Sequence, residues 1–347
     1  MKRLKGTQDI LPAEVGIWNF IEDISRQAFN TYRYKEIRTP IIEEESLFVR
    51  SVGSDTDIVK KQMYAFKDQG KRDIVLRPEE TASVVRAYLE NRLDKTEGFV
   101  KLFYIGPMFR SERPQAGRLR QFHQIGVEAI GSDSAYLDAE VIILLDSLLK
   151  GYGLSDYTLK INSLGCEKDK ANAKELLKKE LKADLSGLCD DCKRRYKTNI
   201  LRILDCKVDA CKKIVSSVSL KGLLCKECDA DFKLLQNKLD EAGIKYEASS
   251  LLVRGLDYYT GIVFEVSSKK LGSQDALAAG GRYDNLVSDL GGERTGACGF
   301  AIGIERVIGA LPASYLQEKA GEDRKGVFLA TIGEEAYKKG FSLLCKL

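Results

Sequence analysis

The sequence contains no long apolar run, and it contains only one histidine. None of its apolar stretches approaches the roughly 18 residues that a membrane-spanning helix needs. The N-terminus, MKRLKGTQDILP, is basic but lacks the apolar core of a secretory signal. We therefore expect a cytoplasmic protein that does not enter a membrane.

Several common signatures are also missing. There is no Gly-x4-Gly-Lys-Ser/Thr loop and no Gly-x-Gly-x-x-Gly after a strand, so two widespread nucleotide-binding folds are not supported. The net charge is only +4, from 55 basic and 51 acidic residues, so nucleic-acid binding would require a local basic cluster. The sequence has no internal repeat, and its nine cysteines without a secretory signal argue against a disulfide scaffold.

The composition is that of a globular protein, with 44% hydrophobic and 31% charged residues. A chain of 347 residues is long enough for about two or three domains. Lysine, aspartate and cysteine dominate residues 166–245, which we expect to form a small helical insertion. The predicted organisation is a core at 1–165, this insertion, the same core continued at 246–325, and the start of a further α/β domain at 326–347.

Hydrophobic periodicity predicts the main elements. Apolar spacing predicts a helix over 15–34. The extended run EIRTPII follows this helix and contains Pro40, which has no backbone N–H to donate, so we expect this run at a sheet edge or an interface. A proline at its first turn is expected to open a helix at residue 78. The other predictions are strands at 72–77, 156–163, 251–267 and 296–304, a hairpin at 99–130, helices at 138–150 and from Glu305, and a strand and a helix in 326–347.

The hairpin is the strongest candidate for a ligand site. Alternation in a strand places Phe122, Gln124 and Glu128 on one face and His123 on the other. Arg110 and Glu112 of the first arm share the polar face, which also carries a glycine, a residue that often marks close approach of a ligand. The alternative is an ordinary solvated sheet face. His123 lies on the apolar face, where a structural role is favoured over catalysis.

Arginines recur at the ends of the predicted strands and helices, at positions 110, 254 and 306. Several arginines that converge on one polyphosphate would stabilise charge during phosphoryl or nucleotidyl transfer. Each segment alone has an ordinary structural explanation, such as a turn at the two glycines of AAGGRYDNL.

Together these segments resemble the class II aminoacyl-tRNA synthetases, and within them the histidyl-tRNA synthetase family. FRSERPQAGRLRQFHQIGVEAIG is similar to motif 2, GFAIGIERV to motif 3, and the first helix with RTPIIEEESLF to motif 1. LVRGLDYYTGIVFEV and AAGGRYDNL are similar to the two segments peculiar to the histidyl enzymes. The resemblance covers about residues 1–325 and also includes KGTQDILP and LRPEET.

The resemblance implies an α+β fold with an antiparallel sheet flanked by helices, and a homodimer formed through motif 1. It implies that histidine attacks the α-phosphate of ATP, supplied with Mg²⁺, to give histidyl-adenylate, and that the histidyl group then passes to the 3′ end of tRNA(His). It also implies roles for individual residues. The residues expected to bind histidine are Glu79, Thr81, Arg110, Gln124, Glu128, Arg254, Tyr258 and Tyr259. Those expected to bind ATP are Arg110, Glu112, Phe122 and Arg306. Arg110 and Arg254 are the expected catalytic residues, and Arg113, Gln115 and Arg118 are the candidates for contacting the tRNA acceptor end.

The C-terminus departs from the family. Members end in an anticodon-binding domain of which only 326–347 are expected here, so the chain is expected to be C-terminally truncated. Some paralogues lack this domain, have lost aminoacylation, and serve as regulatory subunits in histidine biosynthesis. That alternative conflicts with the intact RGLDYYTG segment and with the presence of Glu112 and Arg306.

Paired Cys-x2-Cys segments predict a structural zinc site in the insertion. The expected ligands are Cys189, Cys192, Cys225 and Cys228, with Cys206 and Cys211 as alternative ligands. Zinc is not a general feature of the family, and six unliganded thiols are the other possibility. Cys166, Cys298 and Cys345 are expected to be ordinary thiols.

Overall fold

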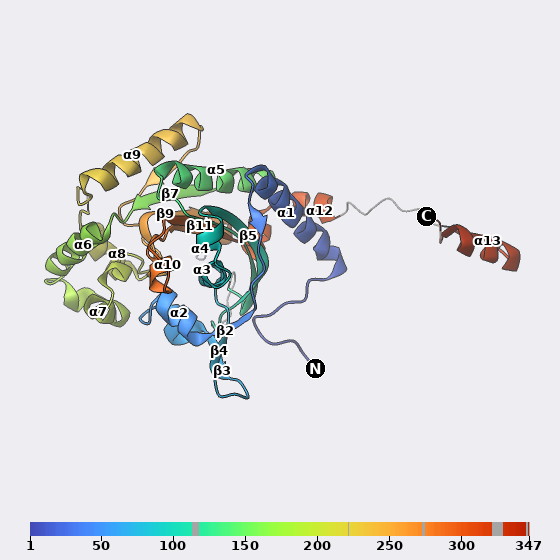
Figure 1. The fold of residues 1–347 in the computed structure, drawn as a ribbon, viewed down its shortest axis with the longest axis horizontal. Coiled ribbons are helices and arrows are strands. Elements are labelled where there is room, and N and C mark those ends of the chain that lie inside the picture. Colours follow the sequence, from blue (N-terminus) through green and yellow to red (C-terminus); the bar gives the residue numbers. More distant parts are fainter. Residues whose placement is uncertain (113–117, 221, 273–274, 321–328, 345, 347) are drawn as a thin grey trace.

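An eight-stranded sheet forms the centre of the computed structural model, which describes residues 1–112, 118–220, 222–272, 275–320, 329–344 and 346 (Figure 1). The strand order is β1-β5-β6-β11-β10-β9-β7-β8, with antiparallel pairs from β5 to β7 and parallel pairs at both edges. The bounds are β1 Lys35–Glu36, β5 Val100–Phe109, β6 Gln121–Ile130, β7 Thr158–Ser163, β8 Glu247–Ala248, β9 Thr260–Ser267, β10 Ala276–Arg282 and β11 Ala297–Gly303. The predicted antiparallel sheet flanked by helices is confirmed.

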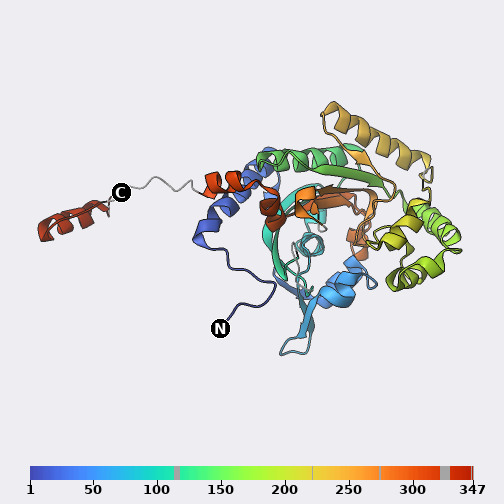
Figure 2. The same cartoon turned by 180° about the vertical axis from the view of Figure 1, so that it is seen from behind.

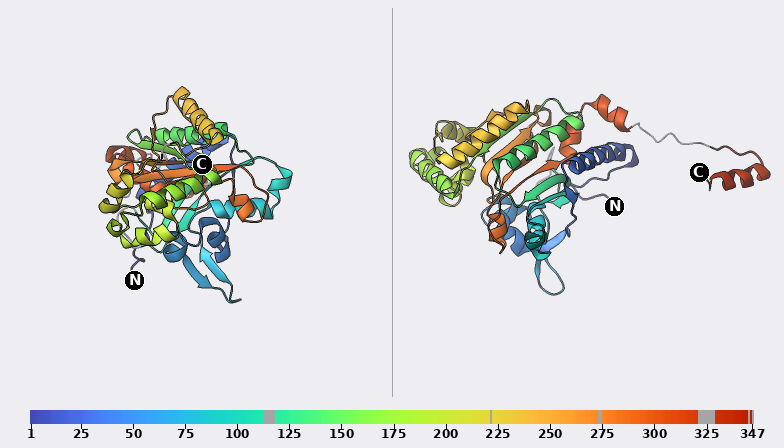
Figure 3. Two further views of the ribbon diagram at one scale, coloured as in Figure 1. Left: turned by 90° about the vertical axis from the view of Figure 1, so that its left-hand side faces the viewer. Right: turned by 45° about the horizontal axis from the view of Figure 1, so that its top comes forward.

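Helices α1 (Pro12–Thr31), α5 (Ala135–Gly151) and α9 (Lys226–Glu241) lie over one face of this sheet (Figure 3), and the helix that begins at Ile304 packs on the same face. The core beneath them includes alternate residues of β6, namely Ile125, Val127 and Ala129, all of which are fully buried. This burial follows from the two-residue repeat of a strand, because successive side chains point to opposite faces. The apolar face predicted for β6 is therefore confirmed.

The opposite face of the sheet carries the candidate site. It is covered by α3 (Thr81–Glu90) and α10 (Leu286–Asp289), and a second core of tyrosines and aliphatic residues lies there. A small sheet, in the order β2-β4-β3, lies beside α2 (Glu45–Val52) and the π-helix η1 (Ile58–Gln62). Its strands are β2 Ile42–Glu44, β3 Tyr64–Lys67 and β4 Asp73–Leu76.

The insertion lies at the end of the molecule away from α1, at the right in Figure 2. It has a hydrophobic core of its own, formed by residues from Leu177 to Val218. Its elements are α6 (Glu167–Glu180), η2 (Leu185–Gly187), α7 (Asp190–Lys197), η3 (Ile200–Ile203) and α8 (Asp209–Ser216). The helix α9 instead contributes Leu235 and Leu239 to the core of the main sheet. The remaining elements are α4 (Leu93–Thr96), η4 (Lys269–Leu271), α11 (Ile304–Ala310), α12 (Ala313–Ala320) and α13 (Glu334–Leu344).

Four local predictions are corrected. Pro40 lies between β1 and β2 and not within a strand. The helix expected to begin at residue 78 begins at Thr81, because the Glu79 carboxylate accepts hydrogen bonds from the first free backbone N–H groups of that helix. Residues 251–259 are not a strand, because they form the loop that leads into β9. Residues 329–333 form no strand either, since no neighbouring strand pairs with them. Among the described residues, no helix is long and apolar enough to cross a membrane.

Candidate active site

The polar face of the β5–β6 hairpin is assembled as alternation predicts. Met108 lies opposite Phe122, Gly106 opposite Gln124, and Tyr104 opposite Gly126. The glycine that suggested a ligand has a different explanation, because a Cβ at Gly126 would lie 2.3 Å from the ring of Tyr104. The space above Gly126 is thus filled by a side chain of the protein itself.

Glu128 lies at the centre of this face and is only 1% exposed. Its Oε1 accepts a hydrogen bond from Thr81 Oγ1 at 2.7 Å, and its Oε2 accepts one from the Tyr283 hydroxyl. Burial raises the pKa of Glu128 to about 8, and the two hydroxyl donors only partly offset this effect. On β11, a Cβ at Gly299 would lie 2.1 Å from Oε2, so the carboxyl group requires glycine there.

Three tyrosines surround Glu128. The rings of Tyr258 and Tyr259 lie 4.7 Å apart, and Tyr283 meets Tyr258 edge to face at 5.8 Å. Tyr283 was not among the predicted site residues, although it lies in the quoted segment AAGGRYDNL. No sequence pattern indicates its partner, because Tyr283 and Glu128 are 155 positions apart.

Glu79 lies at the start of α3 and is buried. Its carboxylate accepts hydrogen bonds from the backbone N–H groups of Thr81 at 2.8 Å and Ala82 at 3.0 Å. Burial raises the pKa of Glu79, whereas these N–H groups and the charge of Arg110 lower it. The structure thus gives Glu79 a helix-capping role at a position that faces the site, and its predicted contact with the substrate ammonium stays a prediction.

Arg110 follows β5 and lies over the ring of Phe122, with its guanidinium carbon 5.1 Å from the ring centroid. Its Nε donates to the carbonyl oxygen of Pro78 at 3.0 Å. Burial lowers the pKa of Arg110, while Glu112 and Glu79 counteract that effect. Glu112 itself forms an ion pair with Arg118 at 3.0 Å. The predicted ATP residues of motif 2 therefore lie together.

The other two arginines approach the same region. Arg254 forms an ion pair with Glu265 on β9, and the Arg254 Nε is buried without a hydrogen-bond partner. Arg306 on α11 donates to the carbonyl oxygen of Ala276 at 2.7 Å. Burial and the nearby charge of Arg118 lower the pKa of Arg306, and Glu265 is among the acids that oppose this. The charge of Arg306 also lowers the pKa of Arg110, so these two cations lie near each other. Glu265, the partner of Arg254, also acts on the pKa of Arg306.

Gln124 has a buried side-chain oxygen, Oε1, without a hydrogen-bond partner. An unsatisfied buried acceptor is costly, so a ligand or a water that donates to this oxygen would stabilise the site. Gln124 shares the polar face of β6 with Glu128, with Gly126 between them, so a polar ligand that lies along this face would contact both.

His123 lies on the opposite face, as predicted. Its ring meets Trp18 edge to face at 4.9 Å, and Nδ1 lies 2.9 Å from the Glu305 carboxylate. The same carboxylate accepts the backbone N–H of His123 at 3.0 Å. Glu305 therefore fixes the start of α11 to β6, which is a structural role for the only histidine.

Two further arginines, Arg282 and Arg77, are buried in ion pairs. Arg282 pairs with Asp138 at 2.6 Å and with Asp284 at 3.0 Å, and it donates to the carbonyl oxygens of Ser132 and Ser134. Arg77 pairs with Glu80 at 2.7 Å, and burial raises the pKa of Glu80 to about 7.

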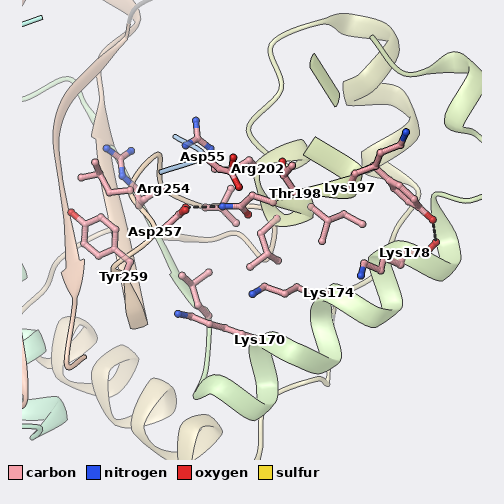
Figure 4. Close-up of a pocket in the computed structure, with 17 residues that line it drawn as sticks. Asp55, Lys170, Lys174, Lys178, Lys197, Thr198, Arg202, Arg254, Asp257 and Tyr259 are labelled. Atoms are coloured by element: carbon pink, nitrogen blue, oxygen red, sulfur yellow. Dashed lines mark hydrogen bonds between the residues drawn. The ribbon is translucent and has the colours of Figure 1, made fainter. Parts of the chain in front are cut away.

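A cavity of about 290 Å³ lies between the 253–259 loop and the insertion (Figure 4). Arg254, Asp257 and Tyr259 line it on one side. Its other side is lined by basic residues of the insertion, namely Lys170, Lys174, Lys178, Lys197 and Arg202. Arg113 and Gln115, predicted to contact tRNA, lie outside the described residues, and Arg118 is the one member of that trio that can be located.

The predicted metal ligands are regrouped by the structure. Cys189 and Cys192 lie with Cys206 and Cys211, while Cys225 and Cys228 lie with Cys166 and Asp169. The expected combination of the two Cys-x2-Cys pairs in one site is therefore wrong, and the alternative ligands Cys206 and Cys211 complete the first group. The expectation that Cys166 is an ordinary thiol also conflicts with this placement.

Comparisons with known proteins agree with the geometry. The family profile described as Histidyl-tRNA synthetase matches residues 6–307. The chain is 52% identical over 335 residues to the histidine–tRNA ligase of Thermosipho melanesiensis, covering 96% of this chain and 80% of that protein. The crystal structure of apo S. aureus histidyl-tRNA synthetase superposes with a TM-score of 0.79 at 35% identity, covering 100% of this chain and 82% of that one. A structure from Bacillus halodurans described as an ATP phosphoribosyltransferase regulatory subunit/histidyl-tRNA synthetase reaches a TM-score of 0.69 at 25% identity, covering 90% of this chain and 83% of that one.

Proposed function

The chain belongs to the histidyl-tRNA synthetase family, and on that basis we propose how its site performs the two-step reaction. The protein is a class II histidine–tRNA ligase that uses ATP and Mg²⁺ to activate L-histidine and then transfers the histidyl group to tRNA(His). Identities near 50% to proteins named as ligases support this activity over a regulatory role in histidine biosynthesis.

The single observation that carries the assignment of the amino-acid site is the buried carboxyl group of Glu128. An imidazole has two ring nitrogens, and one N–H can donate to this carboxylate. Gln124, with its unsatisfied Oε1, and Tyr259 supply further polar contacts, while Glu79 receives the substrate ammonium beside Thr81. Buried partners of this kind reject analogues that lack the ring nitrogens, because the protein groups would be left unpaired.

In the first step the substrate carboxylate attacks the α-phosphate and pyrophosphate leaves. Arg110 holds the α-phosphate and the carboxylate, and Arg254 stabilises the negative charge that builds up at phosphorus. Arg306 binds the γ-phosphate. Glu112 accepts from the adenine amino group and Phe122 stacks on the ring, while the Mg²⁺ that accompanies ATP partly neutralises the phosphates. In the second step a hydroxyl of the terminal adenosine of tRNA(His) attacks the carbonyl of histidyl-adenylate, the ester bond forms, and AMP leaves. Arg113, Gln115 and Arg118 are the candidate contacts for the acceptor end.

We further propose that the protein forms a homodimer. A homodimer through motif 1 would use α1 and the 38–48 segment, where Ile41 and Ile42 are exposed. We also propose domain boundaries at 165 and 325, a cytoplasmic location and structural zinc in the insertion. The boundary expected at 245 is not kept, because Leu235 and Leu239 of α9 pack in the core of the main sheet. Zinc would take no part in the reaction.

Histidine-dependent exchange of labelled pyrophosphate into ATP tests the proposed activity. The folded chain with Mg²⁺ should catalyse exchange only when L-histidine is present, and imidazole-free amino acids such as leucine should not replace it. Absence of exchange in a protein with native circular dichroism would refute the enzymatic function and would favour the regulatory alternative.

A further inference from the structure

Three helices of the protein begin with the same pair of ligand positions. Cys166 and Asp169 open α6, Cys189 and Cys192 open α7, and Cys225 and Cys228 open α9. In each pair the first residue is the N-cap and the second lies three residues later, so both side chains lie at the same end of the helix. The free N–H groups of a first turn favour negative charge nearby, as thiolate ligands would carry.

The first group of four is Cys189, Cys192, Cys206 and Cys211. Their sulfur atoms all lie within 4.8 Å of one another, and Cys189 Sγ and Cys206 Sγ are 3.9 Å apart. Tetrahedral zinc with Zn–S bonds of about 2.3 Å places its sulfurs roughly 3.8 Å apart. The Cys189 backbone N–H also donates to Cys211 Sγ at 3.2 Å, and all but Cys189 are buried. The group thus has the size and the shielding of a closed structural site.

The second group is Cys166, Asp169, Cys225 and Cys228, whose ligand atoms also lie within 4.8 Å of one another. Asp169 is 3% exposed, and its two oxygens accept the backbone N–H groups of Cys225 at 3.1 Å and Cys166 at 3.3 Å. Each carboxylate oxygen keeps a second lone pair. The same carboxylate can therefore orient the two cysteine backbones and still complete a four-ligand set.

We propose that the chain binds two structural zinc ions, one at a four-cysteine site and one at a three-cysteine and aspartate site. Both ligand sets contain the thiolates that favour zinc, and neither leaves a position for a reacting water. Every cysteine that the structure describes is a free thiol, so no disulfide competes for these sulfurs.

The four-cysteine site has a consequence for the active-site loop. Its ligands Cys192 and Cys206 bracket a segment that contacts the core: Arg195 pairs with Asp57 at 3.0 Å, and Arg202 donates to the Gly255 carbonyl at 2.7 Å. Asn199 donates to the Asp257 carboxylate at 2.7 Å. Zinc would thus hold the insertion against residues 255–257, which adjoin Arg254. The effect of zinc on the loop beside Arg254 rests on the proposed function, whereas the binding of two zinc ions does not.

Metal analysis of the full chain tests the proposal. Protein expressed with zinc and passed through a desalting column should carry two zinc ions per chain. Cys206→Ser and Cys166→Ser should each remove one ion, and the double variant should remove both. Cys298→Ser is the matched control, because Cys298 is a buried thiol in β11 outside both groups, and it should retain two ions.

Other stoichiometries would overturn the proposal. Zero or one ion in the unmodified chain would do so. So would two ions retained by both Cys206→Ser and Cys166→Ser. If the two Cys-x2-Cys pairs shared one site, the unmodified chain would hold one ion and both variants would keep it. Should either variant fail to fold, cobalt titration of the unmodified metal-free chain replaces it: the visible bands of tetrahedral thiolate-bound cobalt should rise until two equivalents are added. Saturation at one equivalent, or no bands, would refute two sites.

The metal result and the catalytic result are separable. A chain with two zinc ions that fails in pyrophosphate exchange would refute the proposed enzyme and leave the metal sites standing. A chain that is active in exchange but carries no zinc would refute the metal sites and leave the proposed enzyme standing. If the chain binds two zinc ions and is active, removal of the ion from the four-cysteine site should raise the KM for histidine in pyrophosphate exchange. An unchanged KM would refute the coupling to the 255–257 loop.

Discussion

Replacement of Glu128 by glutamine should make the protein more stable at neutral and alkaline pH while it weakens histidine binding. The carboxyl group is 1% exposed, accepts hydrogen bonds from Thr81 and Tyr283, and lies against Gly299. An amide has nearly the same shape as a protonated carboxyl group and can satisfy the same two hydroxyls. It never carries the charge that burial disfavours.

The magnitude follows from the pKa. Burial moves the pKa of Glu128 from its ordinary value of 4.5 to about 8, so between these values the folded protein binds a proton that the unfolded chain has lost. Stability therefore falls as the pH rises through this window, by about 1.4 kcal/mol per pH unit, or about 3 kcal/mol by pH 7 and about 5 kcal/mol in full. Below pH 4.5 this group makes no difference between the two proteins.

Urea denaturation from pH 5 to pH 8.5 measures the effect. The difference in the free energy of unfolding between Glu128→Gln and the unmodified protein should grow with pH across that range. Glu97→Gln is the control, because Glu97 is exposed and the substitution removes the same charge in water. Parallel profiles for the Glu128→Gln variant and the unmodified protein would refute the reasoning. The histidine KM of Glu128→Gln should rise about 10- to 100-fold, because the amide cannot ionise to the carboxylate that accepts a ring N–H of the bound substrate.

Three other changes have distinct expected results. Arg254→Ala should lower the single-turnover rate of adenylate formation about 100- to 1,000-fold with little change in unfolding free energy, and a near-normal rate would make this arginine structural. His123→Gln should change the exchange rate less than about tenfold, because its ring contacts Trp18 and Glu305 on the far face of the sheet. Arg282→Met should lower the free energy of unfolding by about 3–5 kcal/mol in urea titrations, since it leaves Asp138 buried without its cation; a loss below 1 kcal/mol would contradict this.

The polar face of the hairpin could be predicted because it depends on local geometry alone. The two-residue repeat of a strand decides that Phe122, Gln124 and Glu128 share a face and that His123 does not. The partner of Glu128 could not be predicted in the same way. Tyr283 reaches it from a distant segment, and only the pairing of β6 with β11 and of β11 with β10 brings the two together.

The cysteines illustrate the same limit. Spacing shows that Cys189 and Cys192 can bind one ion, because two ligands three positions apart lie at one helix start. It cannot show which other ligands join them. The structure pairs them with Cys206 and Cys211 and gives Cys225 and Cys228 the partners Cys166 and Asp169.

By itself, the sequence determined the family, the antiparallel sheet, and the face on which the candidate ligands lie, because motifs and alternation are local properties of the chain. The tertiary structure decided which distant groups meet: the hydroxyl of Tyr283 on Glu128, Glu265 on Arg254, Glu305 on His123, and the division of the cysteines into two groups. Contacts of this kind depend on strand order and helix packing, which position residues far apart in the chain within a few ångströms of one another.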